Sequence, residues 1–133
     1  MWEVLSRVHG STCAALEHDM LPKAGIPLGW YDVLASLRRA PDSMMRFQDL
    51  ARVAGISDSG ASRRLEQMVR AGLIDRKSCP SDRRGVYAHL TPRGEATYQK
   101  ANAVFLASLE RTLGRRIEAP DADAVHAALA KLV

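Results

Sequence analysis

Apolar residues recur with the period of an α-helix over much of the chain. Their spacing predicts a first helix over residues 2–20, which Leu21 and Pro22 are expected to end. A second helix is predicted after Pro27, a residue that suits a first helical turn. Its apolar residues are spaced i, i+3, i+4 and i+7, as one buried face requires: Trp30, Val33, Leu34 and Leu37.

Two short helices joined by a tight turn are predicted in the middle of the chain. The first covers residues 47–54, and Gly55 follows where a left-handed C-cap is needed. The second begins near Ser57 and Asp58, both good N-cap residues, and ends near Ala71. Apolar residues of the two helices are placed to pack against each other, which predicts a rigid two-helix unit.

Strand-like alternation of apolar and polar residues replaces the helical period after this unit. The predicted strands cover residues 73–78 and 86–90. A polar and basic segment, residues 79–85, joins them. The sequence therefore predicts a β-hairpin with a basic tip directly after the two short helices.

Two further helices are predicted in the C-terminal part of the chain. Thr91 is a candidate N-cap, and Pro92 suits the first position of a helix that extends to about Arg115. Pro120 breaks this helix and Asp121 opens the last one. These helices and the first helix carry more apolar residues than a small monomer can cover: Leu5, Val8, Phe105, Leu109, Leu113, Val125, Leu129 and Leu132. A two-fold homodimer would bury them.

The expected fold class is mainly α with a small β-hairpin wing (α+β). The middle of the chain, residues 26–91, is expected to be a winged helix-turn-helix DNA-binding domain. The N-terminal helix in residues 1–25 and the C-terminal helices in residues 92–133 are expected to form a dimerisation region.

Positive charge is concentrated in one part of the sequence. The 133 residues include 19 Lys and Arg against 15 Asp and Glu, a net charge of +4. Residues 57–93 hold eight of the basic and four of the acidic residues, and the rest of the chain is balanced. The whole excess therefore lies between the start of the second short helix and the first turn of the helix that follows the hairpin. Such a segment is typical of a nucleic-acid-binding face, although a solvated basic surface has the same composition.

Composition disfavours several classes of protein. Apolar and charged fractions of 47% and 26% are those of an ordinary globular domain, not of a disordered chain. No apolar run approaches the roughly 20 residues of a membrane helix, and the N-terminus lacks the basic start of a signal peptide. Two cysteines are too few for a disulfide scaffold, so a cytoplasmic location is the default. No nucleophile–base pair, metal-ligand spacing or phosphate loop indicates an enzyme or a cofactor.

The outward residues of the second short helix and of the hairpin are the candidate DNA contacts. A helix held by a packed partner can enter the major groove, where Arg can form paired hydrogen bonds to guanine and Ser can bind a base or a phosphate. A thin basic hairpin tip suits the narrow minor groove. The candidates are Ser57, Asp58, Ser59, Gly60, Ser62, Arg63, Arg64, Arg76, Lys77, Asp82, Arg83 and Arg84. Double-stranded DNA is the expected partner.

Two other functions are weighed against this one. A winged-helix module that binds protein is an alternative, but a neutral wing tip would favour it and this tip is basic. A thiol-based redox sensor could use Cys13 or Cys79, although the role of a small apolar residue is favoured for Cys13. His9, Cys13 and Glu17 share a helix face, yet three ligands strung along two turns of one helix cannot all reach one metal ion.

Residues 79–94 resemble the wing of the MarR (multiple antibiotic resistance regulator) family. That family's most specific motif is an Asp-x-Arg element followed by Leu-Thr-x-x-Gly, here Asp82, Arg84, Leu90, Thr91 and Gly94. Residues 56–65 and 70–76 resemble the recognition helix of the family and the entry to its wing. The order of the predicted helices also fits, so the resemblance covers essentially the whole chain.

The resemblance implies a homodimeric repressor or activator, and we expect a repressor bound to a pseudo-palindromic operator. The terminal helices would form the dimer interface. Arg84 would enter the minor groove, with Asp82 bracing it. Small phenolic or other lipophilic effectors often release members of the family from DNA. Trp30 and Tyr31 are candidates for the lining of an effector pocket, although core packing is the favoured role of Trp30.

Overall fold

The computed structural model describes residues 1–53, 58–79 and 81–132. For six residues inside helices or strands it describes the backbone alone: Asp58, Ser59, Cys79, Arg83, Arg84 and Leu132. In chain order the elements are α1 (Trp2–Ala24), α2 (Leu28–Arg39), β1 (Met44–Arg46), α3 (Phe47–Val53), α4 (Asp58–Arg70), β2 (Ile74–Cys79), β3 (Asp82–Leu90), α5 (Pro92–Leu109) and α6 (Ala119–Leu129).

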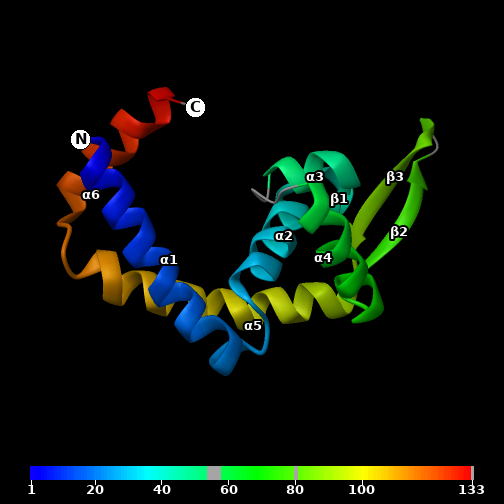
Figure 1. Cartoon of the computed structure of the whole chain (residues 1–133), viewed down its shortest axis with the longest axis horizontal. Helices are drawn as coiled ribbons and strands as arrows, with labels where there is room; N and C mark the ends of the chain where they lie inside the picture. Colours follow the sequence, from blue (N-terminus) through cyan, green and yellow to red (C-terminus); the bar gives the residue numbers. More distant parts are fainter. Residues whose placement is uncertain (54–57, 80, 133) are drawn as a thin grey trace.

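The molecule has a winged end and a terminal end, which α5 connects (Figure 1). At the winged end, α2, α3 and α4 lie beside a three-stranded sheet, and the β2–β3 hairpin projects outward. At the terminal end, where both chain termini lie, α1 crosses α5 and α6 follows α5 in the chain. Within the described residues, no helix is both long enough and apolar enough to cross a membrane.

One apolar core joins the helices of the winged end to the sheet and to α5. Side chains at the predicted i+3, i+4 and i+7 positions of α2 are fully buried, Trp30 at position i is half-buried, and α4 contributes its inward face. The largest buried side chains are Met20, Leu34, Leu37, Leu50, Leu65, Met68 and Ile74. Because members of α1 through β2 share this core, the helix pair α3–α4, which is predicted to be the recognition unit, is held on a rigid support.

The sheet contains a strand that the sequence pattern did not predict. β1 pairs antiparallel with β3, so the strand order is β1-β3-β2. Three residues are too few to show an alternation of polar and apolar positions. A short turn precedes β1, with Asp42 and Ser43 at positive φ, and this turn redirects the chain from α2 into the sheet.

Pro22 and Pro120 were expected to interrupt the chain between helices, and both lie inside helices. α1 continues past Pro22 to Ala24 and ends at Gly25, whose φ of 81° is left-handed. A proline near the C-terminal end of a helix removes one hydrogen bond, and the buried Met20 and Ala24 hold the last turn in place. α6 begins two residues earlier than predicted, with Pro120 in its first turn, where the missing N–H costs nothing.

The Leu-Thr-x-x-Gly motif forms the junction between the wing and α5. The Thr91 hydroxyl accepts a hydrogen bond from the Gly94 N–H at 2.9 Å and donates to the Gly72 carbonyl at 2.7 Å. A Cβ atom at Gly94 would overlap the Leu73 carbonyl oxygen, because the first turn of α5 lies directly on the start of the wing. Thr91 caps α5, and the glycine permits the close approach.

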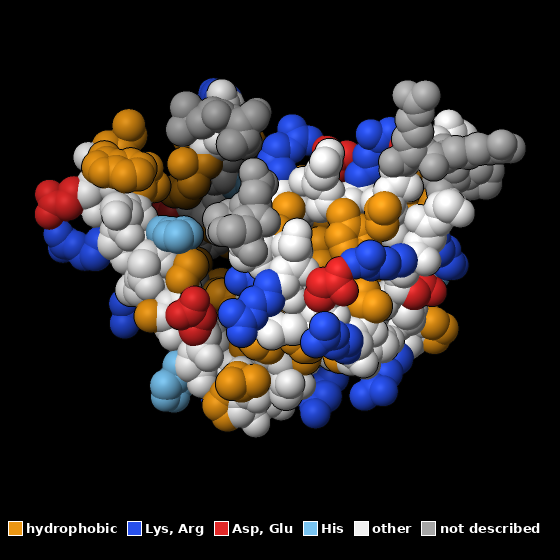
Figure 2. Space-filling model, turned by 45° about the vertical axis from the view of Figure 1, so that its right-hand side comes forward, with side chains coloured by type: hydrophobic (Ala, Val, Ile, Leu, Met, Phe, Trp, Pro, Cys, Tyr) orange, Lys and Arg blue, Asp and Glu red, His pale blue; other side chains and the backbone are white. Residues whose placement is uncertain are grey.

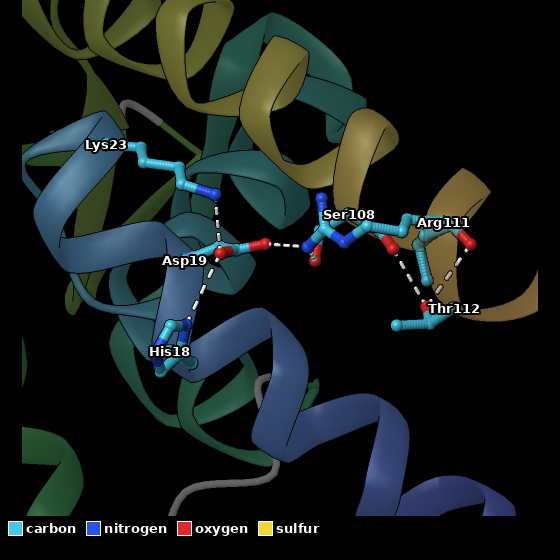
Figure 3. A network of polar contacts seen from close by, with 7 residues as sticks. His18, Asp19, Lys23, Ser108, Arg111 and Thr112 are labelled. Atoms are coloured by element: carbon cyan, nitrogen blue, oxygen red, sulfur yellow. Dashed lines mark hydrogen bonds and ion pairs between the residues drawn. The ribbon is translucent and has the colours of Figure 1, made fainter.

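A buried carboxylate ties α1 to the end of α5 (Figure 3). Asp19 accepts a hydrogen bond from Lys23 at 2.7 Å and pairs with Arg111, which follows α5 in the chain. Lys23, then Ser108 and then Arg111 lower the pKa of Asp19 well below its ordinary value. The ionised carboxylate is therefore part of the folded state, and it fixes the position at which α1 crosses α5.

Replacing Asp19 with asparagine is expected to lower the free energy of unfolding at pH 7. A depressed pKa in the folded state contributes stability above the unfolded value of about 3.9, and this stability is lost as the pH falls through the folded pKa. The difference between the wild-type protein and Asp19→Asn should therefore shrink below about pH 4. Urea unfolding at pH 7 and pH 3 measures this difference, with Glu17→Gln, which changes an exposed carboxylate on the same helix, as control. A pH-independent difference would contradict this role.

Candidate nucleic-acid interface

α3 and α4 pack through their inward faces and leave the opposite face of α4 exposed. Leu50 of α3 and Leu65 and Met68 of α4 are fully buried between the helices and the core. Ser62 and Arg63, on the other side of α4, are exposed. The helix therefore presents a polar and basic face on a packed support, which is the geometry that major-groove reading requires.

The remaining predicted residues of α4 differ in their placement. Ser57 lies outside the described residues, as do the side chains of Asp58 and Ser59. Gly60 is half-buried. The Arg64 side chain leans away from the exposed face, since a Cβ atom at Gly29 of α2 would lie 2.7 Å from one of its guanidinium nitrogens.

The wing is an antiparallel hairpin whose register changes near its tip. Ser78 faces Val86, whereas Cys79 faces Asp82, so β3 carries three extra residues between these pairs. Two of the three are Arg83 and Arg84, whose side chains lie outside the described structure. The backbone thus bulges where the basic residues are attached.

The two basic residues of β2 lie on opposite faces of the sheet. Lys77 is exposed. Arg76 pairs with Glu66 of α4, and its guanidinium carbon lies 5.2 Å from the centre of the Phe47 ring of α3. Arg76 therefore fastens the base of the wing to both helices of the recognition unit, a role that its charge alone did not indicate.

Asp82 pairs with an arginine that sequence reasoning missed. Arg46, the last residue of β1, donates from Nε to the Tyr87 hydroxyl at 2.9 Å and from Nη2 to Asp82. The Tyr87 hydroxyl in turn donates to Asp82 at 3.1 Å. The Tyr87 hydrogen bond and then the Asp82 charge raise the pKa of Arg46 above its ordinary value. A prediction of β1 would have been needed to find Arg46, because the strand places it opposite Tyr87.

The winged end presents a largely basic surface. Figure 2, turned to bring this end forward, shows Lys and Arg side chains across the visible face with fewer Asp and Glu among them. The described cations that lie exposed on α4 and β2 include Arg63, Arg70 and Lys77. A surface of this sign attracts the phosphate backbone of a nucleic acid.

The terminal end differs from the winged end, because several of its apolar side chains are exposed to solvent. Trp2 is 79% exposed, Val8 43%, Leu106 54%, Val125 49% and Leu129 41%. No residue of α6 is buried. An apolar helix with no buried face requires a partner surface.

The other predicted dimerisation residues are less exposed. Leu5, Leu109 and Leu113 are half-buried, and the side chain of Leu132 is outside the described structure. Phe105 stacks on Tyr31, with 4.4 Å between the ring centres, and packs against the core of its own chain. Trp2 and Leu106 were not singled out in the sequence, because a lone apolar residue at a helix end or off the stripe has no pattern to mark it.

A cleft of about 330 Å³ lies between α2 and α5. The residues that line it are Tyr31, Asp32, Ala35, Ser36, Arg39, Val53 and Phe105. Burial raises the pKa of Asp32 above its ordinary value, and Arg64 and Arg39 oppose this shift. Tyr31 is buried and donates to the Asn102 side chain at 2.8 Å, whereas Trp30 packs against the core.

Cys13 has one polar neighbour on α1. Its Sγ atom lies 3.5 Å from Nε2 of His9, while Glu17 is exposed on the same helix. The side chain of Cys79 lies outside the described structure. Among the residues that the structure describes, no group of three His, Cys, Asp or Glu side chains is placed to hold a metal ion.

The helix pair α3–α4 followed by the hairpin defines a winged helix-turn-helix protein. A sequence model of the MarR family matches residues 24–85. AbsC, a MarR family transcriptional regulator from Streptomyces coelicolor, is 30% identical and superimposes with a TM-score of 0.86 over 98% of this chain and 88% of its own. This chain belongs to the MarR family.

Two further relatives extend the comparison. Sco3205, a MarR family regulator from Streptomyces coelicolor whose structure contains DNA, has a TM-score of 0.86 at 22% identity, over 98% of this chain and 82% of its own. The HTH-type transcriptional regulator BilQ from Clostridium symbiosum is 31% identical over 85 residues. That match spans 64% of this chain and 58% of BilQ.

Proposed function

We propose that the protein is a homodimeric transcriptional regulator that binds a specific sequence of double-stranded DNA. The observation that carries this proposal is the exposed polar face of α4, with Ser62 and Arg63, on a rigid core beside a hairpin whose tip holds Arg83 and Arg84. Residues 57–93 also hold the entire net positive charge. Solved relatives with this fold include one bound to DNA, which supports the same partner for this chain.

In this mechanism α4 enters the major groove and the wing enters the adjacent minor groove. Arg63 would bind guanine or phosphate in paired fashion, and Ser62 a base edge or a phosphate. Lys77 and the tip arginines would neutralise phosphates and occupy the narrow groove. Asp58, Ser59 and Gly60 would bring the start of the helix close to the backbone of the DNA. Arg64 and Arg76 would not contact the DNA directly. Arg64 would hold α4 against α2, and Arg76 would hold the wing against α4.

The exposed apolar residues of α1 and α6 support dimerisation through the terminal end. A second copy related by a two-fold axis would cover the apolar residues of α6 that this chain leaves in solvent. It would also place two copies of α4 about 34 Å apart, one turn of DNA, over a pseudo-palindrome. A dimer bound to both half-sites would occupy the operator and so act as a repressor.

The cleft between α2 and α5 is the proposed site of a small phenolic or lipophilic effector. Its volume is at the low end of ordinary ligand pockets, and Tyr31, Phe105 and Arg39 offer aromatic surface and a cation. Asp32 at its wall interacts electrostatically with Arg64 of α4, so the cleft is linked to the recognition helix through this pair of charges.

Fluorescence anisotropy with a labelled nonspecific duplex at several salt concentrations tests the proposal. We expect binding whose logarithm falls linearly with the logarithm of salt, since each neutralised phosphate releases a counterion. Absence of binding, or binding without a salt slope, would exclude the DNA-binding function and favour a winged module that binds protein. Repeating the titration with salicylate tests the effector, because unchanged affinity at saturating salicylate would exclude small phenolic acids.

A further inference from the structure

The wing is attached to the recognition unit at two levels. At its base, Arg76 of β2 pairs with Glu66 of α4 and stacks on Phe47 of α3. Nearer the tip, Arg46 of β1 contacts Tyr87 and Asp82 of β3. We call the three side chains of Arg46, Tyr87 and Asp82 the wing clamp.

The three members of the wing clamp are all hydrogen-bonded to one another. Arg46 donates to both other members, and Tyr87 donates to the same carboxylate oxygen, Oδ2 of Asp82, that accepts from Arg46. The Arg46 guanidinium carbon also lies 5.7 Å from the centre of the Tyr87 ring. Each member therefore fixes the position of the other two.

The clamp reaches from the helix-turn-helix unit to the basic tip. Arg46 directly precedes Phe47, the first residue of α3. Asp82 is the first residue of β3, and Arg83 and Arg84 come next in the chain. The clamp therefore links the start of α3 to the backbone that carries the tip arginines, at the point where the strand register changes.

Gly85 lies against the clamp. A Cβ atom there would come within 2.5 Å of Oδ2 of Asp82 and 2.8 Å of the Tyr87 ring. The φ of Gly85 is not left-handed, so alanine adds no such backbone strain, and the nearest atoms that its Cβ would meet belong to the clamp side chains. A substitution at this position can thus disrupt the clamp without changing any charge.

We propose that Arg46 is a positioning residue for DNA binding: through Tyr87 and Asp82 it holds the wing tip at the angle at which Arg83 and Arg84 meet the minor groove. The proposal rests on the proposed DNA-binding function. The guanidinium of Arg46 pairs with Asp82 of its own chain. Arg46 therefore affects DNA affinity by positioning the wing and not by binding a phosphate.

The test measures the duplex affinity and salt slope of Arg46→Gln, Gly85→Ala and the matched charge control Arg7→Gln on the exposed face of α1. We expect Arg46→Gln and Gly85→Ala each to weaken binding about 3- to 10-fold and to reduce the salt slope, while thermal unfolding stays unchanged. Arg46→Lys should restore part of the affinity, and Arg7→Gln should bind as the wild-type protein does.

Combining Arg46→Gln with Arg83→Ala and Arg84→Ala separates positioning from direct contact. If Arg46 acts through the tip, its replacement should cost no further affinity once both tip arginines are gone. An equal loss in that background, or unchanged binding by Gly85→Ala, would overturn the proposal. The wild-type titration runs alongside, and a wild-type protein that does not bind duplex refutes the proposed function and the role of the clamp together.

Discussion

Replacing Gly94 with alanine is expected to lower the free energy of unfolding by about 3 kcal/mol, at the upper end for added volume in a packed region. The new Cβ atom would overlap the Leu73 carbonyl oxygen and press on the Leu90 side chain. The first of these is a backbone atom at the start of the wing, so it cannot move without shifting β2 or the first turn of α5. The Thr91 cap would be displaced as well, because it accepts from the Gly94 N–H.

Urea unfolding followed by far-ultraviolet circular dichroism measures this loss. Gly10→Ala is the matched control, because Gly10 lies within α1 and a Cβ atom there meets nothing within 4 Å. Alanine at that position should stabilise the protein by about 0.5–1 kcal/mol through helix propensity. The same chemical change thus has opposite expected signs at the two sites, and equal stability of Gly94→Ala and the wild-type protein would contradict the proposed junction.

Replacing Arg84 with alanine is expected to weaken DNA binding by about 1–3 kcal/mol while leaving the fold intact. In the proposed mechanism this arginine enters the minor groove, where the potential is most negative. Loss of one such contact should also lower the salt slope by about one. A gel shift at fixed salt gives the affinity, and thermal unfolding of the same sample reports the fold.

Arg7→Ala is the control for this prediction. Arg7 lies exposed on α1 and pairs with Glu3 on the same helix, so its removal changes the net charge equally at the terminal end of the molecule. Its effect on duplex affinity should be small, because solvent screens charges beyond about 10 Å at ordinary salt. Binding by Arg84→Ala as tight as that of Arg7→Ala would remove Arg84 from the interface.

The sequence predicted the helices and the hairpin because each follows a repeated pattern. The apolar spacing in α2 placed Val33, Leu34 and Leu37 in the core, where they are fully buried. β1 was missed because three residues carry no period, and Arg46, a partner of Asp82, was missed with it. The end of α1 was misplaced because Pro22 was given more weight than the buried Ala24 beyond it.

Charge alone could not separate arginines that face outward from those that serve the fold. Arg63 and Arg64 are neighbours in sequence, yet the first is exposed and the second leans on Gly29. The difference follows from the rotation of about 100° between successive residues of a helix, together with the position of α2. The role of Arg76 likewise could not be predicted from the sequence. It follows from the positions of Glu66 and Phe47 in space, which no local pattern encodes.

Selection of bound sequences from a random duplex pool tests the central claim most directly, because it examines DNA binding, sequence preference and dimer symmetry at once. The account predicts enrichment of an inverted repeat whose half-sites are centred about one helical turn apart, as two copies of α4 related by a two-fold axis require. A pool with no enriched sequence, or with a single half-site and no symmetry, would contradict it.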